Sequence, residues 1–289
     1  MLYHYTSFEG LIQIINNNGV WASHCKYMND SSEYIDALNF PISSSNNIYM
    51  EDSYLSPFAN AISNALVDSM NNDVYISSFS EKPDLISQWR GYCPSGRGVC
   101  IGFKRDVLEK YCHENNLSFN KCIYNESDKF QEMSKLINQC AIEFPMPSVN
   151  RTSYYAFGSK QRTEHEMKYK QYITNGDGKE QADTALSNLR QSITKLAPLF
   201  KNNGFHDESE WRVVAENPAS TIHFRPGNSN LIPYITLPIL KFSNSAIGEV
   251  IIGPNENQHN CVDSISMLLE TNGIDGVNII PSKLPLQHW

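Results

Sequence analysis

The pattern of polar and apolar residues changes its period within the first twenty residues. Residues 2–6 read LYHYT, and the period of two in a strand puts His4 and Thr6 on one face. The next segment, TSFEGLIQIINNNG, spaces its apolar residues as one face of a helix does, and Thr6 with Glu9 forms a capping-box pattern. We therefore predict a short strand that runs into a helix ending near Gly19. The N-terminus of such a helix presents free N–H donors and favours an anion.

The rest of the chain alternates between strand and helix patterns. Further strands are predicted at 19–30, 73–84, 96–103, 208–216, 247–255 and 277–284, and residues 220–230 lead into the apolar segment 231–239. Helices are predicted at 31–39, 55–71, 84–92 and 261–273, with Asp84 as the cap of the short helix 84–92 and a loop at 41–47. Between about 105 and 200 the spacing predicts three or four helices, with a loose connection at 173–183.

Strand patterns at both ends of the chain enclose this helical middle. The arrangement predicts one α+β domain over residues 1–289, with a mainly helical insertion at about 105–200. No stretch approaches the length of a membrane span, and the first residues lack the pattern of a signal peptide. We expect a cytoplasmic protein that does not associate with membranes.

Charge and cysteine content narrow the expected chemistry. The chain has 31 acidic and 23 basic residues and a net charge of -8, which argues against broad electrostatic binding to nucleic acid but leaves a local patch open. Its 7 cysteines include no CxxC pair, which predicts free thiols in a reducing compartment. Cys93, Cys100, Cys112, His113 and Cys122 match no zinc-ligand spacing, so we expect no metal.

The segment ESEWRVV carries the strongest candidate chemistry. On a strand, Glu208, Glu210 and Arg212 share one face, and Trp211 points the other way toward the core. The plain interpretation is a solvated face on which the arginine pairs with its neighbours. The functional interpretation is a carboxylate that stabilises an oxocarbenium-like sugar when the bond to its leaving group breaks.

A second candidate is the segment ISSFSEKPDLISQWRGY. Its strand serines, with Trp89, Arg90 and Tyr92, have the chemistry to hold a ribose, an aromatic ring and a phosphate. The alternative is a packed aromatic residue beside surface serines. His4 alone is equally consistent with a hydrogen-bonded strand histidine. The glycine-rich segment GYCPSGRGVCIG leads into a strand rather than a helix and therefore predicts a hairpin turn, not a dinucleotide-binding loop.

Many short motifs together resemble a known family. They appear in the order LYHYTS, GVWAS, MNDSSE, SFSE, QWRGY, GRGVCIGF, ESEWRVV, LIPYITLP, IIGP and PSKLP. The chain resembles a bacterial family of unknown function whose members begin with a YHYTS-type strand. That family is similar to a distant branch of the ADP-ribosyltransferase superfamily, which includes toxins that modify DNA. The resemblance implies a split mixed β-sheet core and the order His4, then Trp89 or Tyr92, then Glu210.

The resemblance also implies roles for residues in NAD cleavage. Glu210 is expected to bind the ribose 2′-hydroxyl and to stabilise the cation, and Glu208 to orient the acceptor, as in the Glu-x-Glu pattern of the superfamily. His4 is expected at the adenosine-side ribose and Thr6 at a hydroxyl or phosphate. An aromatic ring, from Tyr5, Trp89 or Tyr92, is expected to stack on the nicotinamide, and Arg90 is expected to clamp the pyrophosphate. The strand serines Ser78 and Ser80 are the remaining expected contacts to NAD.

Three functions follow as expectations. The first is an NAD-dependent ADP-ribosyltransferase, a bacterial toxin or phage-defence effector that modifies a nucleic acid (RNA or DNA) or a protein. Such an effector is expected to use NAD as substrate, without a metal, and an antitoxin or chaperone is a possible partner. The second is a non-catalytic module that binds a nucleotide or a partner, in which Glu210 simply pairs with Arg212. The third is an NAD glycohydrolase, for which water is the acceptor.

Overall fold

The computed structural model describes residues 1–28, 53–69, 71–93, 97–227 and 229–285. The predicted helix 31–39, the loop 41–47 and most of the predicted turn at 93–96 lie outside the described residues. The chain divides into two compact units. The first comprises Met1–Asn29, Asp73–Cys122 and Lys201–Trp289, and the second comprises Asp30–Asn72 and Ile123–Phe200.

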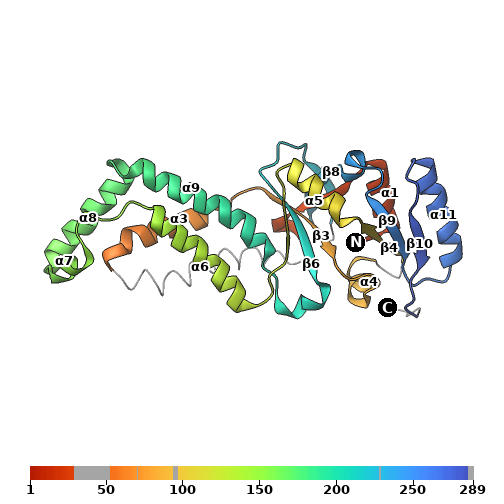
Figure 1. The fold of residues 1–289 in the computed structure, drawn as a ribbon, viewed down its shortest axis with the longest axis horizontal. Coiled ribbons are helices and arrows are strands. Elements are labelled where there is room, and N and C mark those ends of the chain that lie inside the picture. The colour runs from red at the N-terminus through yellow and green to blue at the C-terminus, as the bar shows by residue number, and fades with distance from the viewer. Residues whose placement is uncertain (29–52, 70, 94–96, 228, 286–289) are drawn as a thin grey trace. The chain divides into compact units, whose positions relative to one another are not determined.

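The first unit is built on a mixed β-sheet, which agrees with the predicted α+β class (Figure 1). Its order is β10-β9-β4-β1-β3-β2-β8-β7, with β6 beside β3 and β5 beside β6. Only β9 and β10 pair in parallel among these strands. The strands are β1 (Leu2–Ser7), β2 (Val20–His24), β3 (Val74–Ser80), β4 (Gly98–Phe103), β5 (Ser118–Lys121), β6 (Glu210–Glu216), β7 (His223–Pro226), β8 (Leu231–Leu237), β9 (Ile247–Ile252) and β10 (Asn278–Pro281).

The sheet divides at β3. Along one edge, β3 pairs with β6 over its whole length. Along the other edge, Ser80 pairs with Tyr3 of β1, whereas Ile76 pairs with Ser23 of β2. The strands β1 and β2 therefore leave β3 at opposite ends, and the backbone opens between them.

Helices cover the sheet and enclose the main apolar core. They are α1 (Phe8–Asn16), α4 (Ile86–Tyr92), α5 (Arg105–Glu114), α10 (Ile239–Phe242) and α11 (Gln258–Thr271), and α11 lies along β9 and β10 (Figure 1). Leu11, Ile14 and Ile15 of α1 pack with strand residues such as Val20 and Ile101 in the main core. Burial of these side chains is the dominant favourable term in folding this unit.

The start and end of α1 differ from the prediction by one residue each. Ser7, not Thr6, is the N-cap, because its Oγ accepts a hydrogen bond from the Gly10 N–H at 3.1 Å. At the other end the left-handed residue is Asn18, with φ of 55°, rather than Gly19. The N–H of Gly19 bonds to the carbonyl of Ile14 at 2.9 Å, which completes a Schellman-type ending.

The second unit is helical in its described part. It contains α3 (Ser56–Ser69), α6 (Glu126–Glu143), α7 (Arg151–Ala156), α8 (Ser159–Asn175) and α9 (Lys179–Leu196), and α9 packs against α3, α6 and α8 (Figure 1). The region 105–200 thus holds five α-helices, and its first helix, α5, belongs to the sheet unit together with β5, which was not predicted. The loose connection predicted at 173–183 is wrong, since only residues 176–178 separate α8 from α9. Among the described helices, none has the length and apolar character that a bilayer span requires.

Candidate functional site

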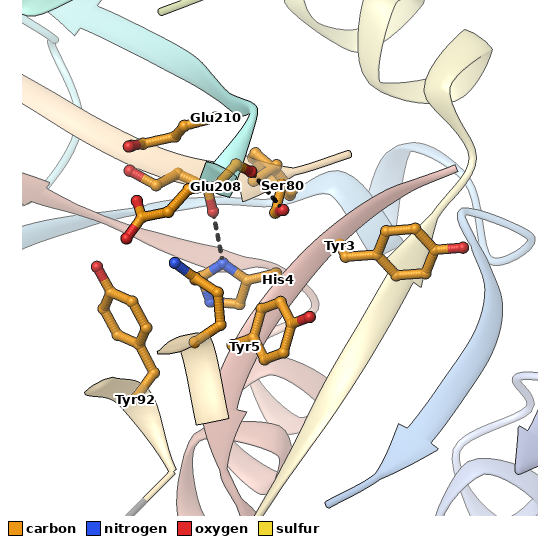
Figure 2. A pocket seen from close by; sticks show the side chains of 10 residues that line it. Tyr3, His4, Tyr5, Ser80, Tyr92, Glu208 and Glu210 are labelled. Carbon is orange, nitrogen blue, oxygen red and sulfur yellow. Dashed lines mark hydrogen bonds between the residues drawn. The ribbon is translucent and has the colours of Figure 1, made fainter. Parts of the chain in front are cut away.

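A pocket opens where the sheet divides, and its walls come from four separate stretches of the first unit (Figure 2). It contains about 380 Å³ of empty space, a figure that includes the open mouth of the pocket. The residues that line it are Tyr3, His4, Tyr5, Ser78, Phe79, Ser80, Gln88, Tyr92, Glu208 and Glu210. Seven of the ten residues predicted from the sequence therefore meet here: His4, Tyr5, Ser78, Ser80, Tyr92, Glu208 and Glu210.

The two glutamates reach the pocket by a route that strand alternation does not predict. The strand β6 begins at Glu210, and Glu208 is the last residue of the 3-10 helix Asn203–Glu208. Ser209 between them adopts a left-handed conformation, with φ of 45° and ψ of 51°. The Ser80 hydroxyl donates to the Glu208 carbonyl at 2.6 Å, and the Glu81 N–H donates to the Ser209 carbonyl at 3.2 Å. The turn at Ser209, held by β3, therefore brings both carboxylates to the same cavity.

Glu210 is a buried carboxylate held by two cations. It is 5% exposed, so the solvated strand face considered from the sequence is wrong. Arg212 donates its Nε–H to Glu210 Oε1 at 2.8 Å, and Lys201 Nζ donates to Oε2. Burial alone raises the pKa of Glu210, but the charges of Arg212 and Lys201 outweigh it and lower the pKa to about 2. The carboxylate therefore stays ionised at neutral pH.

Lys201 is a site residue that the sequence did not point out. It is 3% exposed, and its Nζ also lies 2.7 Å from Glu208 Oε2, so one ammonium bridges both glutamates. Desolvation lowers the pKa of Lys201, but the charge and hydrogen bonds of the two carboxylates raise it overall. The available signal was a lysine placed directly after the apolar run Pro198–Phe200, where a solvated side chain is unusual.

Three residues that line the pocket were not predicted: Tyr3, Phe79 and Gln88. Gln88 of α4 is buried and lines the cavity, and it is spaced four residues from Tyr92 on the same helix face. Tyr3 contributes to the wall, but its ring points away from the glutamates (Figure 2), and its hydroxyl donates to Glu249 at 2.7 Å.

His4 is held in one orientation by the backbone of β3. Its Nδ1 lies 2.9 Å from the Ser78 carbonyl oxygen, which can only accept, so Nδ1 carries the proton. Burial lowers the pKa of His4, and this effect outweighs the hydrogen bond to Ser78, which raises it. The ring is therefore neutral at pH 7, with Nε2 as an acceptor.

The other predicted binding residues of the pocket differ in how they are held. The Tyr5 hydroxyl donates to the Lys82 carbonyl at 2.8 Å and accepts from the Leu85 N–H at 2.9 Å, which leaves its ring as a fixed wall. Ser78 Oγ is buried and has no hydrogen-bond partner among the described residues. Tyr92, at the end of α4, is 43% exposed and offers its ring at the mouth of the pocket.

Three predicted residues do not line the pocket: Thr6, Trp89 and Arg90. Trp89 is completely buried, so a stack on a ligand is wrong for this ring, which packs edge-on against Tyr5 at 5.0 Å. Its Nε1 donates to Asp84 Oδ1 at 2.9 Å, and Asp84 therefore anchors the tryptophan rather than capping α4. The Thr6 side chain instead lies against Gly10 of α1, and Arg90 is exposed on α4 away from the pocket lining.

The cysteines do not gather around a metal in the described part of the chain. None of the 7 cysteines forms a disulfide, and the described residues contain no group of three or more His, Cys, Asp or Glu side chains placed to hold an ion. Cys93 and Cys100 pack instead in a small core with Tyr5, Trp89 and Ile251. Burial raises the pKa of Cys93 to about 12, so its thiol stays protonated.

Comparison with known proteins supports part of the resemblance. The model of a family described as a protein of unknown function, DUF2971, matches residues 88–213. This stretch runs from Gln88 to Val213, so it includes Tyr92, Glu208 and Glu210 of the pocket but not His4. No curated protein and no solved structure matches the chain.

Proposed function

We propose that this chain is an NAD-dependent ADP-ribosyltransferase that acts on a nucleic acid or a protein. The observation that carries the proposal is the meeting of His4 and Glu210 in one pocket, because these residues lie 206 positions apart in the chain. Their order, and the division of the sheet beside them, agree with what the resemblance to ADP-ribosyltransferases implies. Tyr92 at the mouth and Glu208 beside Glu210 supply the remaining groups that the reaction needs.

The proposed reaction uses these groups as follows. NAD enters with its nicotinamide-ribose end in the pocket, and the bond between the nicotinamide nitrogen and ribose C1′ breaks. The electron pair leaves with nicotinamide, and the ionised Glu210 stabilises the oxocarbenium-like ribose through the 2′-hydroxyl. The acceptor then forms a bond to C1′ and gives its proton to Glu208. His4 Nε2 accepts a hydrogen bond from a hydroxyl of the second ribose, and Ser78 Oγ is a further partner for the substrate.

The decisive experiment measures NAD consumption and transfer of label from radioactive NAD to macromolecules. Glu210→Gln should lower both rates by at least about 100-fold, since it removes the stabilising charge. Glu208→Gln should abolish transfer but leave part of the nicotinamide release. The control Glu256→Gln changes an exposed glutamate of the same unit and should leave both rates unaltered. Full activity of a folded Glu210→Gln protein would contradict the proposal.

The cellular setting is a separate part of the proposal. The resemblance to toxins implies a bacterial toxin or phage-defence effector in the cytoplasm, with an antitoxin or chaperone as possible partner. Expression of the wild-type chain should then slow bacterial growth, and Glu210→Ala should relieve the effect. Equal growth with both proteins would contradict this setting.

A second candidate is a non-catalytic module that binds a nucleotide. The observation that favours it is the pairing of Glu210 with both Arg212 and Lys201, which engages the carboxylate in structural contacts. NAD should then raise the melting temperature without any release of nicotinamide. Release of free ADP-ribose without a labelled macromolecule would instead indicate a glycohydrolase.

A further inference from the structure

A row of aromatic rings and one arginine lies on the outer face of β2, β8 and β7. We call it the aromatic face and define it as Trp21, Tyr234, His223 and Arg225. The ring centroids of Trp21 and Tyr234 are 4.7 Å apart, and those of His223 and Tyr234 are 5.5 Å apart. The Arg225 guanidinium lies 5.8 Å from the centre of the Trp21 ring. Four side chains with planar groups from three strands thus form one continuous surface.

Strand register explains why these side chains are not part of the core. Ser23 of β2 pairs with Tyr234 of β8, which in turn pairs with His223 of β7, so their side chains share one face of the sheet. The other face carries Val20, Ala22, Ile235 and Leu237, which are buried in the main core. Trp21 and Tyr234 are half-buried, and His223 is exposed. The sheet therefore keeps one face for packing and presents aromatic rings on the other.

Two donors on the aromatic face have no acceptor. Trp21 Nε1 and Arg225 Nε are buried, and neither has a hydrogen-bond partner among the described residues. Only the Arg225 Nη2 is engaged, and it donates to Ser23 Oγ at 3.1 Å. Both free groups are N–H donors, and one belongs to a cation. Their natural complement is an anionic or carbonyl oxygen, such as those of phosphates and nucleobases.

The aromatic face lies on the same side of the sheet as the pocket of the proposed active site. Ser23 pairs with Ile76 of β3, and Ser78, two residues further along the same face of β3, lines the pocket. Two residues of a strand span about 7 Å. Opposite Ser78 and Ser80 on β6 are Arg212 and Glu210. Strand register therefore places the aromatic face and Glu210 on one side of the sheet, with the buried side chain of Ile76 between them.

We propose that the aromatic face binds the bases of a single-stranded nucleic acid. Stacked rings with an arginine beside them are the means by which proteins hold unpaired bases without reading their sequence. Rings from three strands extend beyond the size of a single base, which favours a strand of nucleic acid over the adenine of NAD. This binding does not rest on the proposed transfer reaction.

The test is binding of a fluorescently labelled 12-nucleotide RNA, and of the DNA of the same sequence, to the full chain without NAD at low salt. Fluorescence anisotropy should report saturable binding that Trp21→Ala and Tyr234→Ala each weaken by about tenfold. Tyr234→Phe keeps the ring and should bind as the wild type does. The matched control is Phe224→Ala. Phe224 is an exposed aromatic residue of β7, between His223 and Arg225, and its side chain lies on the opposite face of the sheet.

Several outcomes would overturn the proposal. One is that neither oligonucleotide binds at millimolar protein concentration. Another is that folded Trp21→Ala binds the oligonucleotide as tightly as the wild-type protein does. Binding of AMP that is lost in Trp21→Ala, together with no binding of either oligonucleotide, would assign the face to NAD instead. Oligonucleotide binding in a chain that consumes no NAD would refute the transfer reaction and leave the binding site standing.

Discussion

The burial of Glu210 between two cations makes a quantitative prediction about stability and pH. The pKa of this carboxyl falls from 4.5 to about 2 on folding. A difference of about 2.5 pKa units corresponds to roughly 3 kcal/mol of stability at neutral pH, at about 1.4 kcal/mol per unit. Since the pKa is lowered in the folded state, this contribution is complete above pH 4.5 and is lost as the pH falls toward 2.

The perturbation is Glu210→Gln, which removes the titrating group. It also leaves Lys201 and Arg212 buried without their shared carboxylate, which adds a cost that does not depend on pH in the acidic range. At about pH 3 the wild-type contribution has fallen to roughly 1 kcal/mol. The stability difference between wild type and variant should therefore shrink by about 2 kcal/mol between about pH 7 and pH 3.

Urea unfolding followed by tryptophan fluorescence is the suitable assay. Trp21, Trp89 and Trp211 belong to the sheet unit, so their signal reports the unit that contains Glu210. The control Glu256→Gln should stay within about 0.5 kcal/mol of wild type at both pH values, because this side chain is exposed. A difference between wild type and Glu210→Gln that does not change with pH would refute the assignment of Glu210 as a desolvated, paired carboxylate.

Three other substitutions test the site. Trp89→Phe should lower the melting temperature, because it removes the hydrogen bond to Asp84, and should leave the KM for NAD unchanged. Tyr92→Ala should raise the KM for NAD several-fold. A raised KM in Trp89→Phe would show that the Trp89 ring touches the substrate. Ser209→Gly should be tolerated, because glycine readily adopts the left-handed conformation of this residue. Ser209→Val should lower the free energy of unfolding by about 1–2 kcal/mol and reduce activity, because a β-branched residue is strained in that conformation. Equal stability of the two variants in urea would contradict the role of this turn. Activity should persist as the pH falls below 6.5, since burial keeps His4 neutral. Any loss of activity at lower pH that is due to protonation of the imidazole should disappear from the pH profile of His4→Gln. If the profile of this variant is unaltered, the loss belongs to another group.

Local pattern was sufficient for much of the fold. Period-two segments predicted β1, β2, β3, β4, β6, β9 and β10, and helical spacing predicted α1, α3, α4 and α11. In α1 and β2, for example, one face is buried and the other is more exposed, so the residues of these elements record their environment. The strands β5 and β7 were not assigned. Each has four residues, none of them buried, so neither carries a pattern that separates it from a loop.

The candidate site was only partly accessible to the same reasoning. The sequence by itself determined that His4, Tyr92, Glu208 and Glu210 are chemically capable side chains in a given order. Only the tertiary structure decided that they share a pocket, because β1, α4 and β6 meet through long-range pairing on β3 and β4 rather than through spacing.

Tertiary structure also decided the fate of individual side chains. A left-handed Ser209 places Glu208 in the pocket, and it has this conformation because β3 holds the carbonyls on both sides of it. Lys201 becomes part of the site because two carboxylates compensate the cost of its burial, and Trp89 leaves it because Asp84 satisfies the indole inside the core. Such outcomes depend on the partners available to a buried polar group, and those partners come from distant segments of the chain.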